Sequence, residues 1–251
     1  MEESGAARGW RELPLFPLST VLFPGAVLQL HVFERRYRLM IRECLRRPEP
    51  AFGVLLIKEG AEVIESPEGE VVRPPAVPHS VGTVAHIVEA APLDNGGYLV
   101  IGLGLGRIRL RRVVQQEPYL IGEVEPLYDE AVGDSAPRCL QAALRLRQAS
   151  REMLQAMVDA VPASDVKQRM RIQALIRSIP TEATELSFFV PRLLGHTRAA
   201  ERQALLESCR LQERLEREEA LLAAQGQQLG QQPGGRGLLS FETGVPAPSL
   251  N

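Results

Sequence analysis

Three glycines at alternate positions, Gly102, Gly104 and Gly106, are the residues that most resemble a phosphate-binding loop. Such a loop binds a nucleotide when a helix follows it directly, because the first N–H groups of the helix then face the phosphates. Here the following residues, Arg107 to Val114, alternate as a strand does. The spacing therefore favours a bend or bulge in a strand over a nucleotide site. The Walker GxxxxGK[ST] pattern is also missing from the sequence.

The histidines and cysteines are the next candidates, as metal ligands or as a nucleophile with its base. They are His31, His79, His86, His196, Cys44, Cys139 and Cys209. No CxxC pair or other metal-ligand spacing occurs among them, which argues against a zinc site and a disulfide framework. A Ser-His-Asp triad stays open, because its members need not be close in sequence, but there is no GxSxG elbow. We therefore predict no catalytic residue, no metal and no cofactor.

A group of four residues, Phe33, Glu34, Arg36 and Tyr37, could bind a peptide. In this interpretation Phe33 and Tyr37 offer apolar contacts beside a groove, and Glu34 and Arg36 offer polar ones. The structural alternative is that Glu34 favours a helix N-terminus through the macrodipole, or pairs with Arg36. Tyr37 would then belong to the core.

A basic stripe, Arg107, Arg109, Arg111 and Arg112, could contact an acidic partner or RNA. No aromatic residues interleave with these arginines to stack on bases. We therefore expect a solvated strand face here, with Arg107, Arg109 and Arg111 on the opposite side from Ile108.

The elements that would position these groups begin with the stretch from Leu13 to Arg47. Pro14 and Pro17 predict a sheet edge or an extended lead-in, because proline cannot donate to a ladder. Val21 to Phe23 is strand-like, Pro24-Gly25 forms a turn, and Ala26 to Val32 reads as the next strand. A helix follows, with a buried face made of these residues: Tyr37, Met40, Ile41, Cys44 and Leu45.

The rest of the chain divides into a β-rich part and a helical part. Strands are expected at 51–57, 81–91, 98–102, 107–114 and 119–125, with a long surface loop from Lys58 to Pro78 and a hairpin turn at Asp94–Gly97. Helices are expected at 138–161, 166–179, 182–194, 198–208 and 211–224, with Ser164-Asp165 and Thr197 as caps. We predict a flexible amino terminus at 1–12, a β-rich domain at 13–127, a helical bundle at 133–224 and a disordered tail at 225–251.

Composition sets the broad class of the 251-residue chain. Its net charge of −2 argues against a general nucleic-acid footprint, so a nucleic-acid partner is not expected. The N-terminus lacks the apolar run of a signal peptide, and no apolar run reaches the ~18 residues that span a bilayer. Three scattered cysteines suit a reducing compartment. We expect a cytoplasmic protein without a membrane partner.

Six motifs in order resemble the amino-terminal, substrate-binding domain of Lon proteases, the peptidase S16 amino-terminal-like family. They are LPLFPLSTVLFPGAVLQLHVFERRY, AFGVLLIK, VGTVAHIVEA, IGLGLGRIRL, EPYLIGEVE and RQALLES, which together cover Leu13 to about Leu222. The chain has Arg35 where the family usually has proline. The resemblance implies an α+β fold: a mostly antiparallel twisted sheet or partly open, PUA-like barrel with one helix, followed by a helical bundle.

The resemblance also implies a function without catalysis. Full Lon proteases carry an ATPase module and a Ser-Lys protease module, and neither Lys58 nor Lys167 has a matching context. We expect peptides or unfolded proteins as partners, with a Lon-type ATP-dependent protease as a further partner in an adaptor or regulatory role, and leave homo-oligomers open. The alternative is an RNA- or small-ligand-binding PUA-like protein, which would show a positive stripe and salt-dependent binding.

Overall fold

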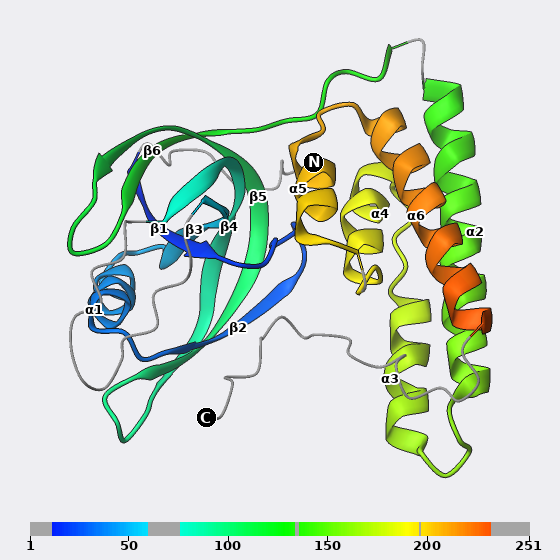
Figure 1. The fold of residues 1–251 in the computed structure, drawn as a ribbon, viewed down its shortest axis with the longest axis horizontal. Helices are drawn as coiled ribbons and strands as arrows, with labels where there is room; N and C mark the ends of the chain where they lie inside the picture. The colour runs from blue at the N-terminus through cyan, green and yellow to red at the C-terminus, as the bar shows by residue number, and fades with distance from the viewer. Residues whose placement is uncertain (1–11, 60–75, 134–135, 196, 232–251) are drawn as a thin grey trace. The chain divides into compact units, whose positions relative to one another are not determined.

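The computed structural model describes residues 12–59, 76–133, 136–195 and 197–231 (Figure 1). The chain forms two compact units, which we describe separately. The described residues of unit 1 end at Tyr128, and unit 2 begins at Asp129. Residues 1–11, 60–75 and 232–251 lie outside the described residues, and with them most of the predicted amino terminus at 1–12, of the loop from Lys58 to Pro78 and of the tail at 225–251. The two ends of that predicted loop, 58–59 and 77–78, belong to strands.

Unit 1 is a six-stranded sheet with one helix. Its elements are β1 (Glu12–Leu18), β2 (Val27–Val32), α1 (Arg35–Cys44), β3 (Ala51–Glu59), β4 (Val77–Pro92), β5 (Tyr98–Gln115) and β6 (Ile121–Pro126). The strand order is β2-β5-β4-β3-β1-β6, and β5 also pairs with β6. The sheet is therefore partly ring-like, although it is not a barrel. All pairings are antiparallel except β1 with β3, which confirms the predicted α+β, mostly antiparallel architecture.

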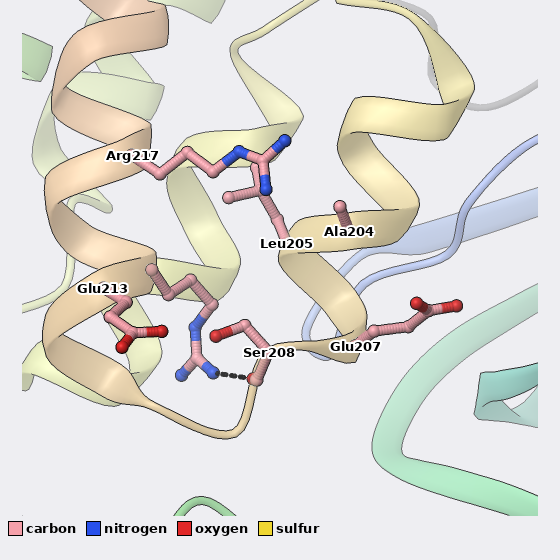
Figure 2. A pocket seen from close by; sticks show the side chains of 7 residues that line it. Ala204, Leu205, Glu207, Ser208, Glu213 and Arg217 are labelled. Carbon is pink, nitrogen blue, oxygen red and sulfur yellow. Dashed lines mark hydrogen bonds between the residues drawn. The ribbon is translucent and has the colours of Figure 1, made fainter.

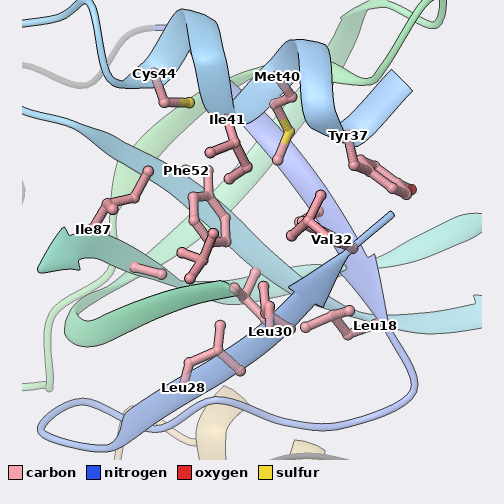
Figure 3. Close-up of a cluster of buried hydrophobic side chains, with 14 of the residues drawn as sticks. Leu18, Leu28, Leu30, Val32, Tyr37, Met40, Ile41, Cys44, Phe52 and Ile87 are labelled. Carbon is pink, nitrogen blue, oxygen red and sulfur yellow. The ribbon is translucent and has the colours of Figure 1, made fainter. Parts of the chain in front are cut away.

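Helix α1 covers the main core of unit 1. Tyr37, Met40, Ile41 and Cys44 recur at helical spacing and are at most 7% exposed. Figure 3 shows them pointing into a cluster with Phe52 and residues of β2. Four of the five residues predicted for this face are therefore correct. Leu45 is the exception at 41% exposed, because it is the C-cap residue and lies past the last turn of α1.

Strand β1 corrects the prediction of a sheet edge, since it pairs with two strands. Glu12–Pro14 pair with β6, and Leu15–Leu18 pair with β3. The N–H of Leu15 donates to the Leu120 carbonyl at 2.8 Å, on the β6 side. Because N–H directions alternate along a strand, Pro14 faces β3 before that pairing begins, and Pro17 faces the β6 side after that pairing ends. Neither proline removes a ladder hydrogen bond.

Both faces of β1 are buried, which explains its nearly continuous apolar sequence. Leu13 and Leu15 pack in a second cluster with Leu55, Val84 and Ile108, whereas Phe16 and Leu18 pack in the main core. Such a strand reads as an apolar run rather than an alternating one. The sequence therefore shows that the segment is extended, but not that it is central.

Two other predictions for unit 1 have opposite outcomes. Val21–Phe23 is buried but is not a strand, so that prediction is wrong. The segment packs across the sheet, and the Thr83 hydroxyl donates to the Leu22 carbonyl at 2.6 Å.

The predicted hairpin turn between β4 and β5 is confirmed. Gly96 has φ +76°, and the Gly97 N–H donates to Asn95 Oδ1 at 3.0 Å.

Unit 2 is helical. It contains α2 (Ala136–Ala160), α3 (Val166–Arg177), α4 (Ala183–Phe189), the short 3₁₀ helix η2 (Val190–Arg192), α5 (Ala199–Glu207) and α6 (Leu211–Gln231). Asp165 caps α3 as predicted, because its carboxylate accepts from the Gln168 N–H at 3.1 Å. The N-cap of α5 is Arg198 rather than the predicted Thr197. Helix α6 continues to Gln231, past the expected start of the tail at 225.

None of the helices in the described ranges is both long enough and apolar enough to cross a membrane.

Candidate functional site

Strand β2 has an open edge. It pairs with β5 along one side, from Val27 opposite Leu103 to Val32 opposite Tyr98. Among the described residues no strand pairs with its other side. The other strands each have at least two strand neighbours, because β5 and β6 also pair with each other. An open edge can accept an extended polypeptide through backbone hydrogen bonds.

Three residues of β2 direct their backbone groups to this edge. The N–H of Gly104 donates to the Ala26 carbonyl at 2.8 Å, and this bond shows which residues of β2 bond to β5 and which do not. Continuing that alternation, even-numbered residues from Leu28 to Val32 bond to β5. Val27, Gln29 and His31 therefore direct their N–H and C=O groups away from β5. We call these three residues the β2 edge.

The β2 edge also carries an exposed apolar surface. Val27 is 51% exposed, and Phe33, just past the end of the strand, is 49% exposed. The His31 and Phe33 rings meet edge to face, with centroids 6.3 Å apart. Opposite the β2 edge on β5 lie three half-buried apolar residues on the same face: Leu99, Ile101 and Leu103. Backbone donors and apolar contact area therefore occur side by side.

The structure separates the four predicted peptide-binding residues. Tyr37 lies in the core at 7% exposed and stacks on Phe16 with ring centroids 4.0 Å apart. Arg36 donates to Glu34 through Nε at 3.0 Å and Nη2 at 2.9 Å, and its guanidinium lies over the Tyr37 ring. Glu34 is the N-cap position of α1. Of the four, only Phe33 presents a large apolar side chain to solvent.

The glycine-rich run has a packing role in β5. A Cβ at Gly104 would lie 2.4 Å from the Phe23 carbonyl oxygen, so the backbone of the Phe23–Ala26 turn can approach only a glycine. Gly25 donates to the Gly104 carbonyl at 2.8 Å, and Gly104 donates to Ala26. No helix follows, since β5 continues to Gln115. The predicted strand irregularity is confirmed by register shifts in the β4–β5 pairing.

The basic stripe on β5 is exposed at Arg111 and Arg112, as expected, but the prediction of a solvated face is wrong for Arg107. Arg107 is only 4% exposed, because a register shift places it opposite the buried Thr83. Arg111 pairs with Glu125, and Arg112 pairs with Glu123, both at 2.7 Å. The charges of β6 thus neutralise much of this stripe. An extended basic surface for RNA is not formed here.

The cysteines, and the histidines that the structure describes, do not gather into a metal-binding group. All three thiols are free, and burial raises the pKa of Cys44 to about 11, so this thiol is protonated at neutral pH. Burial also raises the pKa of Cys139, and Glu216 adds to the effect. Within the described ranges, no group of three or more histidine, cysteine or acidic residues could hold a metal ion.

A pocket of about 470 Å³ lies between α5 and α6 in unit 2 (Figure 2). Its charged lining residues are mixed in sign: Glu207, Glu213, Arg214 and Arg217. The Arg214 side chain is fully buried, and its Nη1 and Nη2 donate to the two Asp129 oxygens at 2.8 and 2.7 Å. It also donates to Ser187 and to the Ser208 carbonyl. Arg214 is therefore a structural cation of unit 2 rather than a free anion site.

Sequence reasoning missed the β2 edge and the buried charges of unit 2. The edge depends on strand order, which no local pattern encodes, although the alternation of Val27, Gln29 and His31 with buried residues was visible. Arg214 and Glu218 lie among leucines in α6, so the signal was a charge at a core position of the helical repeat.

Comparison with known proteins gives one family match, which covers most of the chain. The model of the ATP-dependent protease La (LON) substrate-binding domain matches residues 12–224. The Lon protease of Anaeromyxobacter dehalogenans is 31% identical over 153 residues, which is 61% of this chain and 17% of that protein. Lon protease 2 of Myxococcus xanthus is 28% identical over 213 residues, which is 81% of this chain and 22% of that protein. The chain thus spans about a fifth of these relatives.

Two solved structures share the fold. A Lon N-terminal domain protein from Xanthomonas campestris superposes with a TM-score of 0.51 at 25% identity, covering 88% of this chain and 99% of the other. The N-terminal domain of a Mycobacterium avium complex Lon protease gives a TM-score of 0.57 at 17% identity, covering 84% and 98%.

Proposed function

Because this chain belongs to the ATP-dependent protease La (LON) substrate-binding domain family, we propose that it binds extended segments of protein substrates at the β2 edge. The observation that carries the proposal is the open side of β2, where three residues direct backbone donors and acceptors away from β5. A polypeptide segment could add there as a further strand. Its main-chain bonds would supply affinity with little sequence preference, as a receptor for unfolded proteins requires.

Phe33 would be the principal apolar contact at the end of this edge. Half of its side chain is exposed, and the edge-to-face His31 ring limits its rotation. Glu34, Arg36 and Tyr37 would act indirectly: the Glu34–Arg36 pair and the Tyr37 ring hold the start of α1, and thereby hold Phe33 next to β2. The four residues would thus serve one site, with one of them in direct contact.

We propose further that the chain works without catalysis, as an adaptor or regulator of proteolysis with a Lon-type ATP-dependent protease as a partner. The family of this chain supports substrate binding. The raised pKa of the Cys44 thiol supports the absence of a cysteine nucleophile. Free cysteines favour the cytoplasm as its location.

Self-association through two β2 edges would be the simplest homo-oligomer. For the RNA alternative, the pairing of Arg111 and Arg112 with glutamates of β6 removes the support that the β5 stripe would have given.

The test is a binding titration against one protein in two states. A globular protein that has been reduced and carbamidomethylated stays unfolded, and the untreated protein is the folded comparison. We expect the wild type to bind only the unfolded form, and the Val27→Ser/Phe33→Ser variant to bind it at least tenfold more weakly. Leu140→Ser/Leu144→Ser is the matched control, because these two α2 residues are 60% and 55% exposed. Equal losses in the two variants, or no binding by the wild type, would contradict the proposal.

A further inference from the structure

Four arginines form a stripe on the solvent side of α1. They are Arg35, Arg38 and Arg42 in the helix and Arg46 in the turn that continues it. The spacings of three, four and four residues keep them on one face. That face is opposite the one that buries Tyr37 and Cys44 (Figure 3). We call these four residues the α1 arginine stripe.

The charge of the α1 arginine stripe is not neutralised within the part of the chain that the structure describes. The two carboxylates between residues 33 and 47 are engaged elsewhere: Glu34 pairs with Arg36 at 2.9 Å, and Glu43 accepts a hydrogen bond from the Tyr119 hydroxyl. Arg38 donates to the Gly96 carbonyl at 3.2 Å, which orients it without cancelling its charge. Six arginines and two glutamates between residues 33 and 47 leave a net charge of +4, although the whole chain carries −2.

Apolar side chains lie at both ends of the stripe. Phe33 precedes Arg35 and is 49% exposed, and Leu45 precedes Arg46 and is 41% exposed. A rise of 1.5 Å per residue places Arg35 and Arg46 about 16 Å apart along the axis. Three carboxylates at alternate positions of an extended peptide span about 13–14 Å, so one short segment could contact most of the stripe.

We propose that the α1 arginine stripe binds an acidic segment of a polypeptide partner, with two or three carboxylates within about five residues. Guanidinium groups suit this partner because they bind carboxylates bidentately. A polypeptide is favoured over RNA because, among the residues that the structure describes, Phe33 is the only exposed aromatic side chain next to the stripe, whereas single-stranded RNA is held by successive stacking rings. The stripe is a second surface, and its use does not depend on binding at the β2 edge.

The test is fluorescence anisotropy with a labelled 12-residue peptide that carries glutamate at alternate positions. A peptide with glutamine at those positions is the ligand control. We expect the wild type to bind the glutamate peptide at least tenfold more tightly than the glutamine peptide, and less tightly as salt rises from 50 to 300 mM. The variant R35Q/R38Q/R42Q/R46Q should bind the glutamate peptide about 30-fold more weakly at low salt.

A second variant separates the stripe from net charge. R138Q/R151Q/R171Q/R177Q removes four exposed arginines of unit 2, so it has the same net charge as the stripe variant and should bind like the wild type. Equal weakening of the two variants would overturn the proposal, and so would tighter binding of an oligouridylate of the same charge. If the stripe variant fails to unfold cooperatively, the comparison of the glutamate and glutamine peptides on the wild type decides alone. The Val27→Ser variant should bind the glutamate peptide normally, even if the β2 edge fails its own test.

Discussion

Replacing Gln29 by proline should abolish strand addition at the β2 edge while leaving the sheet intact. The N–H of Gln29 is directed away from β5 by the alternation that Gly104 and Ala26 fix. Proline lacks only this donor, and its φ is tolerated in an edge strand. We therefore expect the free energy of unfolding to change by less than about 1 kcal/mol. At Leu30, which is 9% exposed and bonds to β5, proline should cost about 3 kcal/mol or more.

The loss of binding follows from the backbone bonds at position 29. An added strand would exchange two hydrogen bonds with this residue, each with a net contribution of about 0.5–1.5 kcal/mol. Proline removes the donor, and its ring keeps the partner away from the acceptor. We therefore expect Gln29→Pro to weaken binding of an unfolded polypeptide by about 1–3 kcal/mol, or about five- to 150-fold.

Urea unfolding and fluorescence anisotropy measure the two quantities on the same preparation. The reasoning is refuted if Gln29→Pro is as stable as the wild type and binds as tightly. It is also refuted if Gln29→Pro is as unstable as Leu30→Pro, because the Gln29 N–H would then belong to the β2–β5 ladder.

Three further predictions concern stability, which urea unfolding measures. Gly104→Ala should cost about 2–4 kcal/mol, because its Cβ would lie 2.4 Å from the Phe23 carbonyl, which the turn holds in place. Arg214→Met should cost about 3–5 kcal/mol, because it leaves the Asp129 carboxylate without its bidentate partner. Burial raises the pKa of Glu218, and Arg214 opposes this only in part. A carboxyl whose pKa is higher in the folded than in the unfolded protein lowers the free energy of unfolding as the pH rises above the unfolded-state pKa. Glu218→Gln should therefore stabilise the protein at pH 7.5 and much less near pH 4.

Gly104→Ala and Arg214→Met each have a control variant in the same chain, and Glu218→Gln is compared at the two pH values. Gly102→Ala should be nearly neutral, because its Cβ would meet no atom closer than 3.5 Å. Arg145→Ala breaks an exposed pair with Glu219 and should destabilise the protein far less than Arg214→Met, because solvent screens the exposed pair. A Gly102 variant as unstable as the Gly104 variant, or an Arg145 variant as unstable as the Arg214 variant, would contradict the packing and burial arguments. A gain for Glu218→Gln that is equal at both pH values would contradict the titration argument.

Local sequence patterns predicted the helices and strands of this chain better than they predicted which strands pair with each other. The 3.6-residue period of Tyr37, Met40, Ile41 and Cys44 identified α1, because one helix face packs in the core. The turn chemistry near Gly96 located the β4–β5 hairpin, since a positive φ there depends on the residue itself.

The errors arose where distant strands decide the outcome. The prolines of β1 suggested an edge, but the strand changes partners between Pro14 and Leu15, so the missing N–H groups are not needed. The register shift before Arg107 buried a residue that simple alternation placed in solvent. For the same reason, the β2 edge beside Phe33 was not foreseen, and the peptide-binding role of Phe33, Glu34, Arg36 and Tyr37 stays a prediction.

Residue-resolved amide hydrogen exchange, with and without a saturating unfolded polypeptide, tests the central claim most directly. We predict that the ligand protects the amides of Val27, Gln29 and His31, and leaves those of Leu28 and Leu30 unchanged because they already bond to β5. Ligand-induced protection confined to other parts of the chain, with the three amides of the β2 edge still exchanging freely, would contradict the proposal that substrates bind as an added strand.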